Sequence, residues 1–316
     1  MTKIAIIDMG TNTFHLLLAA VGPDGYSMLY RDHEAVKIGK SGINEGFINP
    51  EACQRAIDAM TKFRDIIDKN GISSIHAFAT SAFRNARNGD ELAKEIKSRT
   101  GIAVRIIGGD EEADLIFEGT RAALDLENEV SLVMDIGAGS VEFIIGDNAR
   151  VLWKQSFEIG GQRLLEKFQK HDPIHPSEIS SLDAYFEGIL TPLLAALAEH
   201  NPTTLVGSSG SFDTLSDIFC IRRKIPRTFD EPETPLTREG FYEIYHELIT
   251  NDREQRMKIE GMISLRVDMI VVASCLIRFV LERHSFARIR VSSYSLKEGA
   301  LAVLAKSMFL SDKQRQ

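Results

Sequence analysis

Two aspartates are each followed by a short run of glycine and hydroxyl residues. Asp8 precedes Gly-Thr-Asn-Thr, and Asp135 precedes Gly-Ala-Gly-Ser. In such a loop the backbone N–H groups can cradle phosphate oxygens, glycine permits their close approach, and the hydroxyls add donors. The carboxylate can hold a hydrated Mg²⁺, which prefers one or two carboxylates plus phosphate oxygens. The residues predicted to bind phosphate in these loops are Asp8, Gly10, Thr11, Asn12, Thr13, Gly137, Ala138, Gly139 and Ser140.

The repetition of the loop is more informative than either copy. Each copy follows an apolar, β-rich run and precedes two further strand-like runs, and the offset is 135 − 8 = 127 residues, about one domain. A single turn of this kind is typical of an ordinary hairpin. Its recurrence one domain later favours two lobes of common architecture.

Two further side chains are candidates for the chemistry. Glu112 lies in the first turn of a predicted helix, and a carboxylate there can orient or deprotonate the water that attacks a phosphoanhydride. Acidic residues in first helical turns also occur for electrostatic reasons alone. Arg84 follows a predicted strand and can clamp a phosphate through its planar guanidinium; the alternative is a helix-surface arginine.

A third glycine-rich turn, residues 207–211, separates a predicted strand from a predicted helix. Gly210 and Ser211 are therefore candidates for phosphate binding at a helix N-terminus, although an ordinary tight connection fits almost as well. The run Gly39-Lys40-Ser41 is no Walker A loop, because that motif needs a glycine where this chain has Glu34.

Hydrophobic periodicity and turn residues predict the elements that must position these side chains. In the first lobe, strands are expected at 3–8, 14–20, 26–38, 72–79 and 103–107, with helices from 50 to 70, within 81–99 and at 110–124. In the second, strands are expected at 130–134, 141–145, 151–157, 204–206 and 288–291, with helices at 162–169, 176–200, 211–218, 237–249, 266–284 and 295–306.

Composition limits the classes of protein that fit. A chain of 316 residues suits two domains, and 44% hydrophobic with 26% charged residues is typical of a soluble globular protein. No apolar run reaches the roughly 20 residues of a membrane helix, and the N-terminus enters a strand directly, so no membrane association is expected. Three cysteines without metal-like spacing favour a reducing, cytoplasmic location. The net charge of −8 argues against nucleic acid as a partner.

The order and spacing of these motifs resemble the exopolyphosphatase / pppGpp phosphohydrolase family, within the actin–sugar kinase–Hsp70 superfamily. The resemblance covers nearly the whole chain. The matching stretches are 7–16 (IDMGTNTFHL), Ile38-Gly39 with Gly42, 79–84 (ATSAFR), 109–113 (GDEEA), 135–142 (DIGAGSVE), 160–164 (GGQRL), 266–268 (RVD) and 296–299 (LKEG).

The resemblance implies an α/β fold of two ribonuclease-H-like lobes, residues 1–124 and 125–296, with the active site in the cleft between them. It implies that a closing helix, 297–310, packs back on the first lobe. Glu112 is expected to act as general base on the attacking water. Asp135 and Glu142 are expected to serve Mg²⁺, with Asp8 assisting, and Arg84 is expected to contact phosphate.

The expected function is release of terminal phosphate from inorganic polyphosphate. The sequence leaves hydrolysis of pppGpp (guanosine pentaphosphate) in the stringent response open, since both substrates present a terminal phosphoanhydride. A sugar-kinase-like phosphotransferase and a non-catalytic phosphate or alarmone sensor are the remaining alternatives. Members of the family often form dimers, so a homodimer is an open expectation.

Four positions depart from the family pattern. Asp114 stands where a basic residue is usual, Ala138 replaces a common glycine, and His15 stands where arginine is frequent. Residues 293–295 (Ser-Tyr-Ser) replace a glycine-containing approach to the closing helix. None of these changes removes a proposed catalytic carboxylate, so their expected effect is on activity level and substrate choice.

Overall fold

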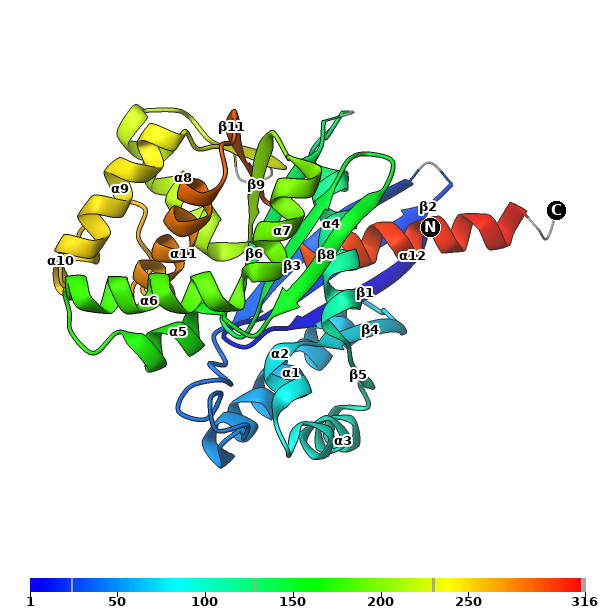
Figure 1. Ribbon diagram of the computed structural model, residues 1–316. Helices are drawn as coiled ribbons and strands as arrows, with labels where there is room; N and C mark the ends of the chain where they lie inside the picture. The colour runs from blue at the N-terminus through cyan, green and yellow to red at the C-terminus, as the bar shows by residue number, and fades with distance from the viewer. Residues whose placement is uncertain (24, 128, 229–230, 314–316) are drawn as a thin grey trace. The chain divides into compact units, whose positions relative to one another are not determined.

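The computed structural model describes residues 1–23, 25–127, 129–228 and 231–313 (Figure 1). The chain divides into two compact units, here called unit 1 (Met1–Ala122 with Leu296–Gln316) and unit 2 (Ala123–Ser295). Each unit contains its own buried apolar cluster.

Unit 1 contains a five-stranded sheet in the order β3-β2-β1-β4-β5. The central strand β1 is antiparallel to β2 and parallel to β4. The expected third strand ends at Glu34 rather than at 38, and Lys37 adopts a left-handed φ of 49°, which a continuing strand cannot accommodate. The strands are β1 (Thr2–Met9), β2 (Phe14–Gly22), β3 (Gly25–Glu34), β4 (Ser74–Ala79) and β5 (Val104–Ile106).

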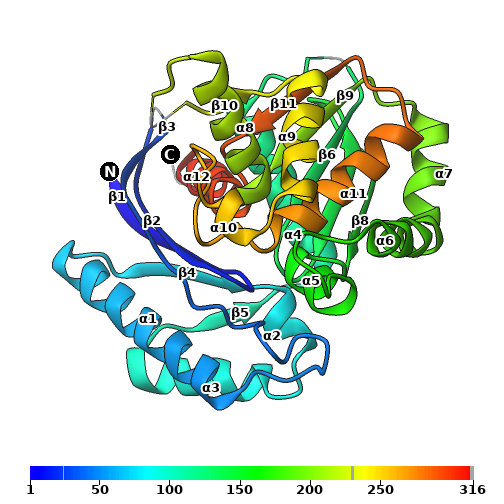
Figure 2. The same cartoon turned by 90° about the vertical axis from the view of Figure 1, so that its left-hand side faces the viewer.

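Helices cover both faces of this sheet. Figure 2 shows α1 and α3 beneath it and α12 on the opposite face. Helix α1 begins at Pro50 because the Asn49 side chain accepts a hydrogen bond from the Ala52 N–H at 2.8 Å and proline suits the first helical turn. The helices of unit 1 are α1 (Pro50–Lys69), α2 (Ser81–Asn85), α3 (Gly89–Thr100), α4 (Gly109–Ala123) and α12 (Leu296–Lys313).

The closing helix α12 packs on β1, β2 and β3 and lies against α4. A Cβ at Gly299 would lie 1.7 Å from the backbone oxygen of Leu115 and 2.7 Å from the backbone nitrogen of Gly119. The two helix backbones therefore approach too closely for any side chain at this position. Lys306 and Glu118 form an ion pair at 2.9 Å further along the same two helices.

Replacing Gly299 with alanine should destabilise unit 1 by about 2–3 kcal/mol, because the two helices must separate to admit one methyl group. Gly188, which has open space around its added Cβ, is the matched control. Gly188→Ala should be neutral or stabilising by up to about 1 kcal/mol, since it lies in α6. Thermal unfolding midpoints of both variants test this; equal midpoints would show that α12 does not need the close approach.

Unit 2 repeats the arrangement of unit 1 in a six-stranded sheet, ordered β10-β11-β9-β6-β7-β8. Strand β6 is antiparallel to β7 and parallel to β9, as β1 is to β2 and β4. The expected fold class, two α/β units of common architecture, is confirmed. The strands are β6 (Ser131–Ile136), β7 (Val141–Gly146), β8 (Val151–Phe157), β9 (Thr204–Ser208), β10 (Glu233–Pro235) and β11 (Arg288–Ser292).

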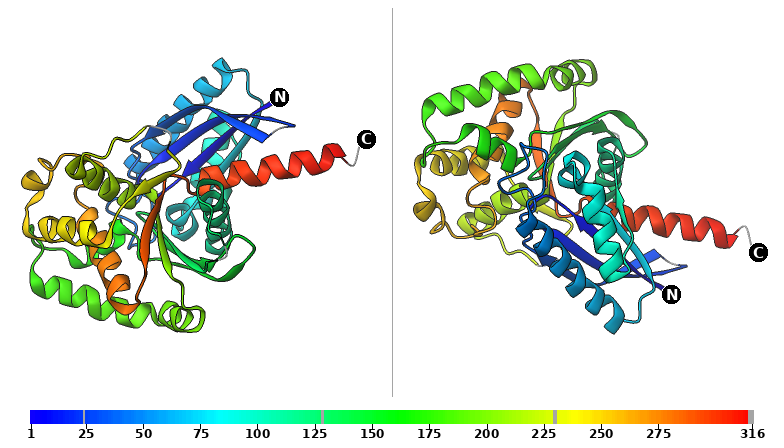
Figure 3. Two further views of the ribbon diagram at one scale, coloured as in Figure 1. Left: turned by 90° about the horizontal axis from the view of Figure 1, so that it is seen from above. Right: turned by 90° about the horizontal axis from the view of Figure 1, so that it is seen from below.

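The helices of unit 2 gather largely on one side of its sheet, as Figure 3 shows for α6, α9 and α11. The expected helix 176–200 is two helices, because Pro192 cannot continue an α-helical hydrogen-bond ladder. The expected helix at 266 begins only at Ile270. The helices are α5 (Gly161–Phe168), α6 (Pro176–Ile189), α7 (Thr191–His200), α8 (Ser209–Arg223), α9 (Arg238–Thr250), α10 (Arg253–Arg256) and α11 (Ile270–Arg283).

Within the described residues, no single helix has the length and apolar composition to cross a membrane. Helices α6 and α7 meet both requirements only when taken together, and a bend of 66° separates them.

Candidate phosphate-binding and catalytic site

Hydrogen bonds from the N-terminus of α5 orient the peptide groups of the loop after β6. Three consecutive loop carbonyls accept hydrogen bonds from three successive backbone N–H groups there. The pairs are Gly161 N–H to Gly137 O at 2.9 Å, Gln162 N–H to Ala138 O at 2.9 Å and Gly160 N–H to Gly139 O at 3.1 Å. In a trans peptide the C=O and N–H point in opposite directions. The N–H groups of Ala138, Gly139 and Ser140 therefore point away from α5, an arrangement of successive amides that can bind an anion.

The contact between this loop and the N-terminus of α5 explains the residue types at 160–163. A Cβ at Gly160 would lie 2.4 Å from the Ala138 carbonyl carbon, so only glycine allows the loop and the helix to touch. Arg163 adds a hydrogen bond from Nε to the Gly139 oxygen at 2.8 Å. Both features hold the loop carbonyls toward α5 and its amides outward.

The loop after β1 has the same internal geometry. The Gly10 N–H donates to the Thr13 oxygen at 3.1 Å, just as the Gly137 N–H donates to the Ser140 oxygen at 3.1 Å. The Thr11 and Asn12 carbonyls accept from Gly39 and Lys37, at 3.1 and 2.9 Å. The N–H groups of Asn12 and Thr13 therefore point away from residues 37–39.

Two threonine hydroxyls in the first loop lack partners. Thr11 Oγ1 and Thr13 Oγ1 are buried, and neither has a hydrogen-bond partner within the part of the chain that the structure describes. A buried hydroxyl left unsatisfied costs about 1–3 kcal/mol. A phosphate oxygen that accepts a hydrogen bond from such a hydroxyl would remove that cost, so these orphaned groups favour an anion site.

Asp135, at the end of β6, is 4% exposed and accepts hydrogen bonds from three serine hydroxyls. Ser208 and Ser295 donate to Oδ2, each at 2.6 Å, and Ser209 lies 2.8 Å from both Oδ1 and Oδ2. Ser209 has a left-handed φ of 69°, a strained conformation that clusters at functional sites in proteins. We call these three residues the serine clamp.

Glu142 is the cross-strand partner of Asp135 between β6 and β7, so the two side chains lie on one face of the sheet. It is 1% exposed and accepts a hydrogen bond from Ser156 to Oε1 at 2.6 Å. In unit 1 the equivalent partners are Asp8 and His15, since 142 − 15 is also 127. The second carboxylate of the pair is therefore present in unit 2 and replaced by an imidazole in unit 1.

The side-chain atoms of unit 2 that could bind a metal suit a hard cation. Asp135, Glu142 and the clamp hydroxyls offer only oxygen atoms, which Mg²⁺ prefers. No group of three or more His, Cys, Asp or Glu side chains gathers in metal-binding geometry among the described residues. A two-carboxylate arrangement still fits Mg²⁺, because this ion usually keeps several waters and takes its other ligands from substrate phosphates.

Glu112 and Arg84 lie together in unit 1. Glu112 is in the first turn of α4 and 6% exposed, and Arg84 Nη1 lies 2.8 Å from its Oε2. The same nitrogen donates to the Ile107 carbonyl at 3.0 Å. The charge-assisted hydrogen bond from the Arg84 guanidinium fixes the orientation of the Glu112 carboxylate. The structure thus gives Arg84 a contact with Glu112, in addition to the phosphate contact that the resemblance implies.

Gly210 and Ser211 lie in the first turn of α8. The space that a side chain at Gly210 would take is filled by the Arg266 guanidinium, whose Nη2 would be 2.1 Å from an added Cβ. Burial lowers the pKa of Arg266, and the charges of Asp213 and Asp135 oppose that shift. Arg266 is therefore a cation beside this turn and near Asp135, a placement that no local sequence signal predicts.

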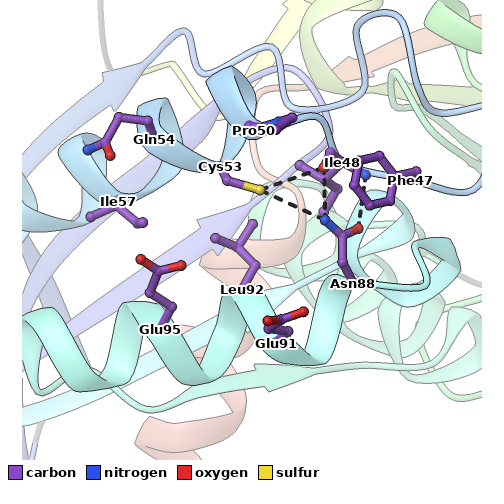
Figure 4. Close-up of a pocket in the computed structure, with 10 residues that line it drawn as sticks. All are labelled: Phe47, Ile48, Pro50, Cys53, Gln54, Ile57, Asn88, Glu91, Leu92 and Glu95. Atoms are coloured by element: carbon purple, nitrogen blue, oxygen red, sulfur yellow. Dashed lines mark hydrogen bonds between the residues drawn. The ribbon is translucent and has the colours of Figure 1, made fainter.

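A separate pocket of about 300 Å³ lies in unit 1 between α1 and α3. Figure 4 shows Cys53 at its centre, with Sγ 3.7 Å from the Ile48 carbonyl and 3.9 Å from Asn88 Nδ2. Burial and the charges of Glu95 and Glu91 raise the pKa of this thiol, so it stays in the poorly nucleophilic neutral form. None of the predicted site residues lines this pocket.

Two related α/β units with outward-facing amide loops and adjoining carboxylates define a phosphotransfer or phosphohydrolase class of protein. Residues 17–308 match the Ppx/GppA phosphatase family. The chain belongs to that family and is a phosphohydrolase enzyme.

Individual relatives agree with this assignment. The crystal structure of an exopolyphosphatase from Cytophaga hutchinsonii is 43% identical, with a TM-score of 0.94 over 97% of this chain and 98% of that one. Exopolyphosphatase 2 of Mycobacterium tuberculosis is 29% identical over 96% of this chain and 99% of its own length. A bifunctional 3-dehydroquinate synthase/phosphatase of Fusobacterium nucleatum is 31% identical over 88% of this chain, which matches only 43% of that protein.

Proposed function

We propose that this enzyme releases the terminal phosphate of inorganic polyphosphate in a Mg²⁺-dependent reaction, with Glu112 activating the water. The proposal rests mainly on the pair of loops 127 residues apart. In both loops, hydrogen bonds to the loop carbonyls orient the peptide N–H groups away from the supporting segment. The names of the Cytophaga and Mycobacterium relatives favour polyphosphate over pppGpp as the substrate.

In this reaction the backbone amides of each loop bind phosphate oxygens, and the Thr11 and Thr13 hydroxyls are further donors in unit 1. Asp135 and Glu142 hold the cation, which when bound neutralises the charge that develops on the phosphoryl oxygens. Unit 1 supplies Asp8 as an assisting carboxylate. Because His15 replaces the second carboxylate there, the main cation ligands are assigned to unit 2.

The chemical step is a displacement by water at the terminal phosphorus. The water oxygen forms a new P–O bond, the bridging P–O bond breaks, and the shortened polyphosphate leaves with the electron pair of that bond. Glu112 accepts the proton of the water. Arg84 orients the Glu112 carboxylate through the contact at 2.8 Å.

Phosphate release with Mg²⁺ from polyphosphate, pppGpp and ATP tests the proposal. The enzyme should have a higher kcat/KM for polyphosphate than for the other two, and removing Mg²⁺ with a chelator should abolish release. A higher kcat/KM for pppGpp would transfer the assignment to the alarmone. Absence of turnover on all three would contradict the proposed substrates and favour a phosphate or alarmone sensor.

A further inference from the structure

The two oxygens of Asp135 are in unequal surroundings. Ser208 and Ser295 donate to Oδ2 at 2.6 Å, and Ser209 Oγ lies 2.8 Å from both Oδ1 and Oδ2. Among the described residues, Ser209 is the one hydrogen-bond donor within reach of Oδ1. A carboxylate oxygen offers about two lone-pair sites, and O–H···O⁻ bonds of about 2.5–2.7 Å are the strong, charge-assisted kind. The hydrogen bonds from Ser208 and Ser295 therefore fill both lone-pair sites of Oδ2.

Oδ1 has fewer hydrogen-bond donors around it than Oδ2 has. The Ser209 hydroxyl lies 2.8 Å from both oxygens and has one proton to donate. Because Ser208 and Ser295 fill the two lone-pair sites of Oδ2, that proton goes to Oδ1 and takes one of its two sites. Oδ1 therefore keeps a lone pair that is directed neither at Ser208 nor at Ser295. A cation that approaches Asp135 would meet this oxygen.

The two donors to Oδ2 restrain the carboxylate from different elements. Ser208 ends β9 and is the parallel-strand partner of Asp135. Ser295 is the last residue before α12 and lies 160 residues from Asp135 in the sequence. Because the donors are attached to separate elements, rotation of the carboxylate about χ2 would break at least one short hydrogen bond.

We propose that Ser208 and Ser295 are positioning residues that lock Asp135 through Oδ2 and so present Oδ1 to the divalent cation. This inference rests on the proposed function in one respect only, that Asp135 is a cation ligand. Groups that hydrogen-bond to a metal ligand typically change metal affinity about 10–100-fold when they are removed.

The test measures binding of Mn²⁺, as a spectroscopic substitute for Mg²⁺, by the loss of the free-ion electron paramagnetic resonance signal. The double variant S208A/S295A should raise the Kd for Mn²⁺ about 10–100-fold, and S295A alone about tenfold. S295T, which retains the hydroxyl, should restore most of the affinity. Thermal unfolding confirms that each variant is folded, and S295A serves alone if the double variant is not.

Ser216→Ala is the matched control. Ser216 is a buried serine of α8 whose hydroxyl lies 2.9 Å from Thr234 Oγ1 and 2.8 Å from the Pro235 carbonyl, and no hydrogen bond joins it to Asp135. This variant should bind Mn²⁺ as wild type does. If S295A and S208A/S295A also bind as wild type does, or if wild type binds no Mn²⁺, the proposal is overturned.

Phosphate release from polyphosphate, measured in the same samples, separates this inference from the proposed function. Wild type that binds Mn²⁺ but releases no phosphate would overturn the proposed function and leave the lock intact, provided that S295A weakens binding. Wild type that is active, with an S295A variant of unchanged affinity, would leave the function intact and overturn the lock.

Discussion

Replacing Glu112 with glutamine should lower the turnover number about 10²-fold or more while leaving KM nearly unchanged. Glutamine keeps the size of the side chain, and its amide oxygen can still accept the hydrogen bond that Arg84 donates to Glu112 Oε2 at 2.8 Å. It cannot accept a proton from water. The loss should therefore fall on the chemical step and spare substrate binding. Steady-state phosphate release with polyphosphate measures both constants.

Glu111→Gln is the matched control for this prediction. Glu111 is the preceding residue in the same first turn of α4, but it is exposed and pairs with Arg105 at 2.7 Å. Its replacement removes the same charge from the same helix terminus and should leave turnover within about twofold of wild type, as is usual for exposed ion pairs. Equal turnover in Glu112→Gln and Glu111→Gln would refute the assignment of Glu112 as the base.

Replacing Asp135 with asparagine should reduce turnover about 10²-fold or more. It should also raise the Kd for Mn²⁺ about 10²-fold or more, because losing a direct ligand weakens metal binding more than losing the hydrogen bonds that support it. Ser208 and Ser295 donate to the Oδ2 position, so the amide oxygen of asparagine should take that place. The amide nitrogen then occupies the Oδ1 position and turns its N–H groups toward the cation. The clamp itself enforces the unfavourable orientation.

Asp147→Asn controls for the loss of one carboxylate from unit 2. Asp147 accepts hydrogen bonds from the backbone N–H groups of Ala149 and Arg150, at 2.7 and 2.9 Å, in the turn before β8. That variant should retain wild-type turnover and Mn²⁺ affinity. If Asp135→Asn regains activity when Mg²⁺ is raised, a role in cation affinity is supported. If it binds Mn²⁺ as tightly as wild type, the role of Asp135 as a ligand is refuted.

The sequence predicted the fold well where local signals are strong. The strand and loop patterns at Asp8 and Asp135 are repeated, and each strand pairs with the next across a short turn, so the first three strands of each unit could be located from order alone. The ends of elements were less predictable. Pro192, which divides α6 from α7, is visible in the sequence, yet apolar residues on both sides suggested one continuous helix. The short β10 and α10 carry no periodicity from which to detect them.

The candidate residues show the same division. The sequence predicts separate roles for Glu112 as a base and Arg84 as a phosphate ligand. It does not predict their contact, because the two residues lie 28 positions apart and no local signal connects them. The orientation of the loop amides was likewise not predictable. It depends on hydrogen bonds from the N-terminus of α5 in one unit and from residues 37–39 in the other, which are non-local contacts.

By itself, the sequence determined the backbone chemistry of the two loops, because glycine allows these turns and hydroxyl residues supply donors. The strand register that places Glu142 opposite Asp135 was found in the structure. Only the tertiary structure decided what surrounds Asp135. Ser208, Ser209 and Ser295 are short polar residues without periodicity, and they lie 73, 74 and 160 positions away. Their convergence on one carboxylate depends on strand order in the sheet of unit 2, which no local pattern records.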